Sequence, residues 1–233
     1  MTISTINKSQ HKAATVAGYA FLITFAIVAF VNFGIIDPLI VENNATETAL
    51  NILANEQLFR IGIIGNLIYC TGLMVLFTAL YVILKPINKG LALLGTFWRL
   101  VWVLMWLLMT LNRVDALRLI IGGTYLEIFE AKHLQALGSF YLAKGIDYYY
   151  VGLLFTGLAS TLYSYLWLKS DYIPKAIAVY GIISSAFCVG CTFIFIIFPH
   201  FDQIVNLWWF DMPMVIFDLA LSIWLLFKGL RTR

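Results

Sequence analysis

The sequence is poor in charge, because only 12% of its 233 residues are Asp, Glu, Lys or Arg, whereas a soluble globular domain carries about 25%. It has only three cysteines, and Cys70, Cys188 and Cys191 all lie in apolar runs, so no framework of extracellular disulfides is expected. No two histidines share a helix at ligand spacing, and no nucleotide-binding loop, nucleophile elbow or H-E-x-x-H motif occurs. The sequence therefore predicts no metal site, no cofactor and no recognisable catalytic set.

Apolar residues are abundant instead, at 62% of the chain, and the mean hydropathy is +0.90. This much apolar surface cannot be hidden in one water-soluble core, so much of it is expected to face lipid. The net charge of +3 comes from a few basic clusters rather than from a basic stripe interleaved with aromatics. Membrane lipids are therefore expected as partners, and nucleic acid is not.

Six segments are long enough to cross a bilayer, at about 20 residues each. They cover residues 14–36, 61–84, 91–111, 146–168, 176–198 and 207–227. Backbone polar groups in lipid must be satisfied within their own segment, so each is predicted to be a helix. The predicted fold class is an all-α integral membrane protein with six transmembrane helices, forming a single polytopic domain over residues 1–233.

Basic residues are distributed unequally between the predicted connections. The side that holds the N-terminus receives Lys8, Lys12, Lys85, Lys89, Lys169, Lys175, Lys228, Arg231 and Arg233, with Asp171 as its only acid. The other side receives Arg60, Arg113, Arg118, Lys132 and Lys144 together with ten acids. The positive-inside rule therefore predicts that both termini lie in the cytoplasm.

The two outer connections, residues 37–60 and 112–145, are long, and connections of this length are usually functional or disordered. Asn44 with Glu47, and Thr124 with Glu127, have the spacing of a helix-capping pair. We expect a partly helical extracytoplasmic cap. The alternative is that these helices simply lie at the lipid headgroups.

The two inner connections, residues 85–90 and 170–175, are short and predict tight helical hairpins. The segments NILANEQLFRIGIIGNL (51–67), KPINKGLALLGTFWRL (85–100) and SDYIPKAIAVYGI (170–182) resemble those of the bacterial membrane proteins grouped as domain of unknown function 4386. The resemblance covers most of the chain. It implies a polytopic helical membrane fold and a bacterial source, hence the cytoplasmic (inner) membrane, but it implies no activity.

Arg99 is the one cation deep in a predicted span, in the run GTFWRLVWVLMW (95–106). It lies about 12 Å from the inner end of its helix, at 1.5 Å per residue. A central arginine costs roughly 2.5–3.5 kcal/mol to insert and normally faces a partner. Asp218 lies at a similar depth in the last span, so we predict an Arg99–Asp218 pair, with Trp102 in reach of a cation–π contact.

Further polar residues fall near the outer helix ends: Asn32, Asn66, Asn112, Arg113, Asp147, Tyr148 and Asp211. Asp211 is two helical turns before Asp218 and so shares its face. Pro213 either kinks this helix or marks its first turn, with Asp211 as the N-terminal cap. If these groups converge, they form a polar vestibule that leads to Arg99. If they do not, they are ordinary interfacial residues.

Several functions are compatible with this pattern. The first is binding or transport of a small anionic or amphipathic molecule, which includes a lipid, with Arg99, Asp218, Asn66, Asp147, Trp102 and Asp211 as ligand-binding residues. The second is a structural or regulatory membrane subunit in which the Arg99–Asp218 pair only holds helices together. An intramembrane enzyme has the least support, and redox chemistry at the Cys188–Cys191 pair lacks the second cysteine pair that it would need. The sequence does not define the oligomeric state.

Overall fold

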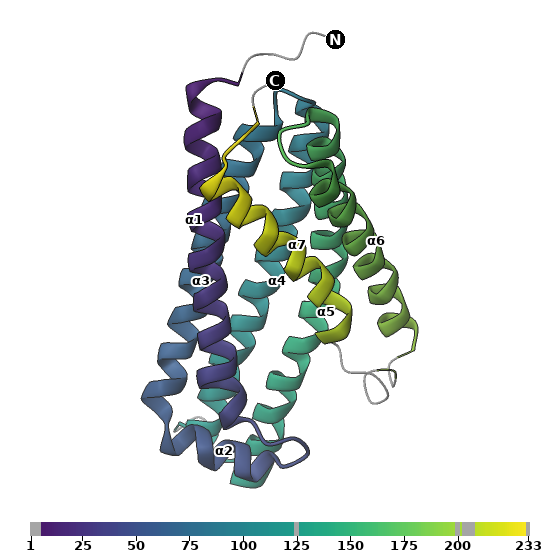
Figure 1. The fold of residues 1–233 in the computed structure, drawn as a ribbon. Coiled ribbons are helices and arrows are strands. Elements are labelled where there is room, and N and C mark those ends of the chain that lie inside the picture. Colours follow the sequence, from purple (N-terminus) through teal and green to yellow (C-terminus); the bar gives the residue numbers. More distant parts are fainter. Residues whose placement is uncertain (1–5, 124–125, 199–200, 202–207, 232–233) are drawn as a thin grey trace. The chain divides into compact units, whose positions relative to one another are not determined.

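The computed structural model describes residues 6–123, 126–198, 201 and 208–231, and this part of the chain is helical without any strand (Figure 1). The elements are α1 (Lys8–Val31), the π-helix η1 (Asn32–Ile36), the 3₁₀ helix η2 (Asp37–Leu39), α2 (Ala45–Ala54), α3 (Glu56–Leu84), α4 (Lys89–Ile121), α5 (Ala131–Ser170), α6 (Lys175–Ile197) and α7 (Trp208–Phe227).

Six helical segments of the described chain are long and apolar enough to cross a membrane. They are Lys8–Leu39, Glu56–Leu84, Lys89–Ile121, Ala131–Ser170, Lys175–Ile197 and Trp209–Phe227. Each corresponds to one predicted span; the spans predicted at 176–198 and 207–227 extend one or two residues beyond the observed helices at one end. The six predicted helices are therefore confirmed. Large apolar side chains such as Ile64, Phe97 and Ile183 are more than half exposed. Such surfaces on helix after helix are suited to lipid rather than to water.

The predicted outer connection 112–145 is much shorter than expected. Helix α4 continues to Ile121, and α5 begins at Ala131. Gly122, at a φ of +77°, ends α4 in the left-handed conformation that favours glycine. Hydropathy marks where a segment stops being apolar, whereas a helix continues for as long as its backbone hydrogen bonds do. Thr124, the predicted cap of a second outer helix, lies outside the described residues.

The short helix predicted to begin at Asn44 is confirmed as α2. The Asn44 side-chain oxygen accepts a hydrogen bond from the Glu47 backbone N–H at 3.0 Å, and its amide donates to the Glu47 carboxylate at 2.8 Å. The first of these bonds satisfies the Glu47 N–H, a donor at the helix start that has no partner within the helix. The buried face of α2 consists of Thr48, Ala49 and Ile52.

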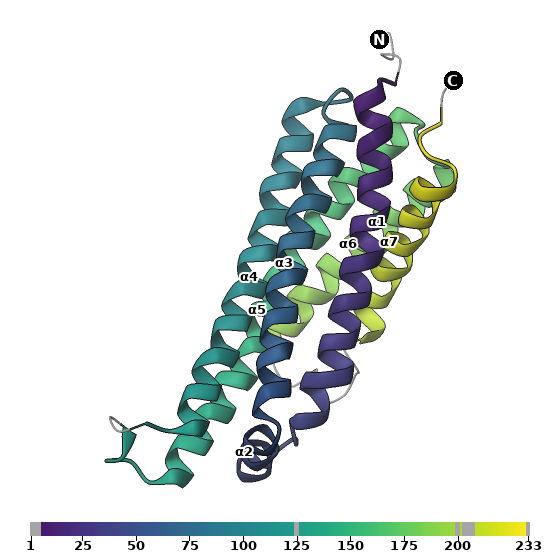
Figure 2. The same ribbon diagram turned by 90° about the vertical axis from the view of Figure 1, so that its left-hand side faces the viewer.

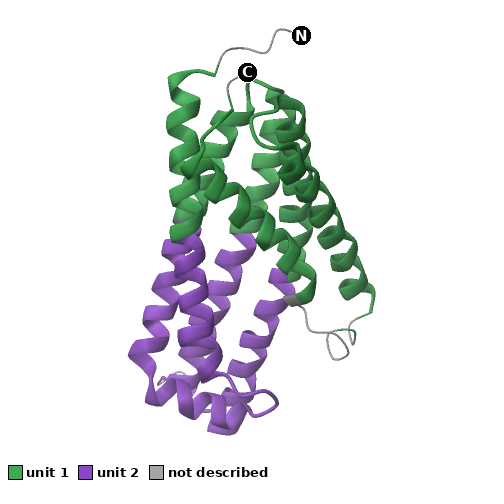
Figure 3. Cartoon of the chain, in the orientation of Figure 1, with its two compact units in different colours: residues 1–23, 72–103, 150–233 green, residues 24–71, 104–149 purple. Residues whose placement is uncertain are grey.

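The chain divides into two compact units (Figure 3). Unit 1 consists of residues 1–23, 72–103 and 150–233, and unit 2 of residues 24–71 and 104–149. The long helices α1, α3, α4 and α5 therefore each contribute one part to each unit.

One end of unit 1 is closed by hydrogen bonds between segments that are distant in sequence. The Gln10 amide at the start of α1 donates to the Ile83 carbonyl at 3.1 Å and to the Tyr172 hydroxyl at 3.2 Å. The Arg231 N–H, beyond α7, donates to the Tyr172 carbonyl at 2.9 Å. Four segments therefore meet at one end of unit 1: the start of α1, the end of α3, the α5–α6 turn and the segment after α7. An even number of spans requires the two termini to lie on the same side, which agrees with this arrangement.

The helices of unit 1 approach closely where a glycine faces a ring. Gly95 of α4 packs under the ring of Tyr163 on α5, and Gly181 of α6 packs under Phe217 of α7. Small residues allow such close approach between membrane helices, where packing rather than water exclusion drives association. The two inner hairpins, α3–α4 and α5–α6, are formed as predicted, and α3 runs beside α4 in both views (Figures 1 and 2).

Unit 2 has its own core where α2 packs against the end of α1, η1 and the neighbouring parts of α3 and α4. Its buried members are Val31, Ile35, Ile36, Leu39, Ala49, Ile52, Phe59, Ile63, Leu117 and Ile120. An aromatic group lies further along the same helices: Trp106 makes edge contacts with Tyr69 at 4.8 Å and with Tyr149 at 6.3 Å between ring centroids.

Candidate functional site

Arg99 lies on α4 in unit 1 and is buried, with 7% of its surface exposed. Its Nη1 donates to the Thr156 hydroxyl at 3.0 Å, and its Nη2 donates to the Ser160 hydroxyl. Thr156 and Ser160 are one helical turn apart on α5, so both hydroxyls face the guanidinium from one side of that helix. The partners of the guanidinium are therefore neutral groups of α5.

An aromatic ring covers the same cation. The guanidinium carbon of Arg99 lies 5.1 Å from the centroid of the Phe77 ring on α3. A ring face attracts a cation through its quadrupole, and this attraction is stronger where water is excluded. Arg99 is thus held by two hydroxyls and one ring, which come from two different helices.

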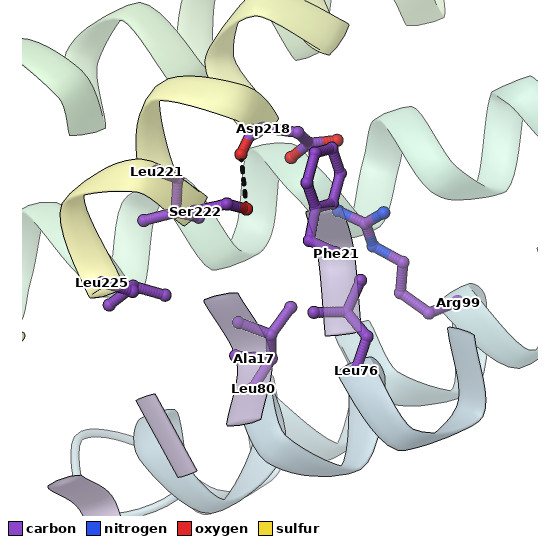
Figure 4. A pocket seen from close by; sticks show the side chains of 9 residues that line it. All are labelled: Ala17, Phe21, Leu76, Leu80, Arg99, Asp218, Leu221, Ser222 and Leu225. Atoms are coloured by element: carbon purple, nitrogen blue, oxygen red, sulfur yellow. Dashed lines mark hydrogen bonds between the residues drawn. The ribbon is translucent and has the colours of Figure 1, made fainter. Parts of the chain in front are cut away.

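Arg99 and Asp218 both line one small pocket, and the guanidinium points toward the carboxylate of Asp218 (Figure 4). The pocket is lined by Ala17, Phe21, Leu76, Leu80, Arg99, Asp218, Leu221, Ser222 and Leu225. Its volume is about 20 Å³, which is enough for about one water molecule, since about 10–15 Å³ is needed. Arg99 and Asp218 are its two charged groups, and the remaining lining, apart from Ser222, is apolar.

The structure places the two predicted charges in one pocket but not in a direct bidentate pair. No hydrogen bond joins the two side chains in Figure 4, whereas Ser222 donates to the Asp218 backbone carbonyl at 2.8 Å. The two terminal guanidinium nitrogens donate hydrogen bonds to the hydroxyls of Thr156 and Ser160. These hydroxyls were missed because serine and threonine in an apolar span usually bond to their own backbone. The one feature of the sequence that could have indicated them is their spacing of one helical turn in FTGLAS (155–160), which puts both hydroxyls on one face of the helix.

Asp211 lies on α7 in unit 1 and is buried, with 6% of its surface exposed. Helix α7 begins at Trp208, so Asp211 and Pro213 both lie within it, and the prediction that Asp211 caps its start is wrong. The Cys188 thiol of α6 lies within electrostatic range of both Asp211 and Asp218. The two carboxylates therefore share one face of α7, as their spacing predicts.

Trp102, one turn beyond Arg99 on α4, is buried with 7% of its surface exposed. Its indole therefore packs within the protein rather than facing lipid. The cation–π partner that the structure assigns to Arg99 is Phe77, which hydropathy alone does not distinguish from the other apolar residues of its span.

Two of the predicted ligand-binding residues, Asn66 and Asp147, belong to unit 2. Asn66 is fully buried, and its amide donates to the Gly62 carbonyl of its own helix at 3.0 Å. Asp147 is exposed, so it does not share the buried surroundings of the other predicted residues. Their part in binding stays a prediction.

Unit 2 has a partly buried polar contact of its own. Arg113 of α4 donates to the Asn32 side-chain oxygen at 2.9 Å, and Asp37 lies within electrostatic range of Arg113. Asn32 opens the π-helix η1, and the extra residue of a π-turn changes the direction of the side chains that follow. The sequence placed Asn32 and Arg113 among the outer polar residues without indicating that they pair.

The cysteines are free thiols, and all three are buried. In the part of the chain that the structure describes, no three His, Cys, Asp or Glu side chains come together as metal ligands would. The charged and hydroxyl groups around Arg99 are therefore the chemistry that this site presents.

These features define the class: a helical, membrane-like protein with six candidate spans and a pocket lined by the buried Arg99 and the half-buried Asp218. The chain belongs to the family described as Domain of unknown function (DUF4386), which matches residues 16–229, in agreement with the resemblance seen in the sequence. Searches of curated proteins and of solved structures found no match.

Proposed function

We propose that this protein binds or transports a small anion across the bacterial cytoplasmic membrane, with Arg99 as the anchor for the negative charge. The observation that supports this proposal is how Arg99 is surrounded. Two neutral hydroxyls and one aromatic ring contact its guanidinium, no carboxylate is in direct contact with it, and it lines a pocket. Ionisable residues within the membrane usually mark ligand or ion pathways.

Hydroxyl groups orient a guanidinium without neutralising it. Arginine keeps its proton in proteins, so the positive charge stays in surroundings of low polarity. Its Nε has no hydrogen-bond partner among the described residues. A buried donor without a partner costs about 1–3 kcal/mol, and more for a charged group. A small anion that entered the pocket would relieve part of this cost.

The size of the pocket narrows the class of ligand. A volume of about 20 Å³ suits a monatomic or small inorganic anion, whereas sites for drug-sized ligands usually measure about 300–1,000 Å³. An amphipathic molecule, which the sequence also allowed, would require the surrounding helices to separate. We therefore favour an inorganic anion.

The orientation in the membrane follows from charge. The end of unit 1 that joins Gln10, Ile83, Tyr172 and Arg231 is flanked by the lysine-rich segments of the sequence. The positive-inside rule puts this end in the cytoplasm. The same charge rule, applied to the sequence alone, predicts that the segment containing α2 lies on the periplasmic side.

A structural role for the pocket is the second candidate. The hydroxyls that bind Arg99 also connect α4 to α5, and Thr96 and Tyr163 add a hydrogen bond of 2.7 Å between the same helices. In this case the protein would be a structural or regulatory subunit, and the pocket would hold water or nothing.

Binding of radiolabelled chloride to the full-length protein in detergent tests the proposal. We expect saturable binding that Arg99→Met abolishes and Arg60→Met leaves intact. Arg60 is a matched control because it is half-exposed and pairs with Glu56 on its own helix. Nitrate should compete, whereas gluconate, which is too large for the pocket, should not. Absence of saturable chloride and nitrate binding in the folded wild-type protein would rule out the proposal.

The structural alternative predicts a different pattern. Removing one partner of a buried charge pair costs about 3–5 kcal/mol, whereas replacing both by apolar residues is often neutral. If the pocket is only structural, Arg99→Met/Asp218→Leu should recover the stability that each single change loses, and the wild-type protein should bind no anion. If it binds anions, the recovered double variant should have lost a ligand that the wild type retains.

A further inference from the structure

We infer that anion binding at Arg99 is coupled one-to-one to protonation of Asp218. This inference rests on the proposed function and adds its regulation by pH. The observation behind it is that one pocket with room for about one water molecule holds one cation and one anion, which are not in direct contact.

The two charges that line the pocket balance each other. Arg99 contributes one positive charge from α4, and Asp218 contributes one negative charge from α7. The contributions of α1 and α3 to the lining are apolar: Ala17, Phe21, Leu76 and Leu80. The space does not admit a hydrated counter-ion, so any change of charge must be compensated by these groups themselves.

Other titratable groups face these charges from the neighbouring helices. Cys188 of α6 lies within electrostatic range of Asp218 and also of Asp211 on α7. Tyr163 of α5 lies within electrostatic range of Arg99. The Tyr163 hydroxyl is already paired with Thr96. Asp211 is two helical turns from the pocket on the same helix and does not line it. Asp218 is therefore the carboxylate whose protonation can compensate a new negative charge beside Arg99.

An anion that enters this pocket would leave it with one net negative charge. A buried, uncompensated charge is costly in surroundings of low polarity. Protonation of Asp218 removes this charge: a proton from water forms an O–H bond with one carboxylate oxygen, and no other bond is made or broken. The neutral acid can then donate a hydrogen bond to the anion. One proton therefore enters with one anion.

The coupling has a quantitative signature. Where Asp218 is ionised in the empty protein, the apparent Kd for a monovalent anion should rise about tenfold for each unit of pH, because one proton is taken up per anion bound. Below this range the Kd should become constant. Asp218→Asn carries no titratable proton, so its Kd should be independent of pH.

Chloride binding to the full-length protein in detergent, measured over a series of pH values, tests the coupling, because chloride itself does not titrate. We expect a slope of about one in log Kd against pH. The slope should be retained in Glu56→Gln, which changes a partly exposed carboxylate on α3, and absent in Asp218→Asn. A second measurement is the uptake of protons by weakly buffered protein when chloride is added, with about one proton taken up per site.

The outcomes separate the two proposals. If chloride and nitrate do not bind at any pH, anion binding fails, and the coupling fails with it. If chloride binds with a Kd that does not change with pH, the coupling alone is wrong. If the slope disappears in Asp211→Asn and persists in Asp218→Asn, the proton goes to the other carboxylate, and the assignment to Asp218 is overturned.

Discussion

Replacing Gly95 by alanine should loosen the contact between α4 and α5 beside the Arg99 site. A methyl group at Gly95 would overlap the Tyr163 ring, meeting its Cδ1 at 2.8 Å and its Cζ at 3.3 Å. The ring cannot easily turn away, because Tyr163 is buried at 2% exposure and its hydroxyl is paired with the Thr96 hydroxyl at 2.7 Å. Either the ring or the helix must therefore shift.

The magnitude follows from two opposing effects. Alanine in place of glycine within a helix stabilises it by about 0.8–1.0 kcal/mol. Adding an atom to a well-packed interior costs about 1–3 kcal/mol. Gly190 in α6 offers a matched control, because a Cβ there would meet nothing within 4 Å. The helix effect cancels between the two variants, so Gly95→Ala should be less stable than Gly190→Ala by about 1–3 kcal/mol.

Thermal unfolding of the purified full-length variants in the same detergent, followed by circular dichroism, measures this difference. A second readout is site-specific: Tyr163 is one turn from Ser160 on α5, so a shift of the ring should also weaken chloride binding in Gly95→Ala and not in Gly190→Ala. Equal stability of the two variants would refute the packing of Tyr163 on Gly95 and, with it, the close approach of α4 and α5.

Three further changes test other parts of the structure. Ser160→Ala should destabilise the protein by about 1 kcal/mol in thermal unfolding, because an Nη2 donor of a buried guanidinium loses its acceptor; Thr71→Ala, where the exposed hydroxyl bonds to its own helix, should have almost no effect. Asn44→Ala should remove the α2 cap and raise hydrogen exchange at the first amides of α2, at a local cost of about 1 kcal/mol; unchanged exchange would contradict the capping role. Arg113→Met should lower stability by about 0.5–1.5 kcal/mol, because the partly buried Asn32 side-chain oxygen loses its donor. The exposed Arg118 should tolerate the same change; equal losses would show that the contact contributes nothing.

The sequence predicted those features that depend on short stretches of chain. The six spans follow from apolar length, since a bilayer requires a continuous apolar segment whatever the neighbouring helices do. The start of α2 follows from Asn44 and Glu47, whose bonds are made within one helical turn. Even the similar depth of Arg99 and Asp218 follows from counting residues along two helices.

The partners of Arg99 were decided by tertiary structure. Nothing in the sequence states that α5 packs against this face of α4, so Thr156 and Ser160 could not be distinguished from other hydroxyls, nor Phe77 from other aromatic residues. Hydropathy likewise could not predict where α4 ends and α5 begins. It also could not predict that Arg113 pairs with Asn32, which opens a π-helix. Apolar length and helix caps depend on residues that are close in the sequence, so the sequence predicts them. Side-chain partners depend on which helices pack together. Helices with similar apolar surfaces could pack in several ways, so the sequence does not predict these partners.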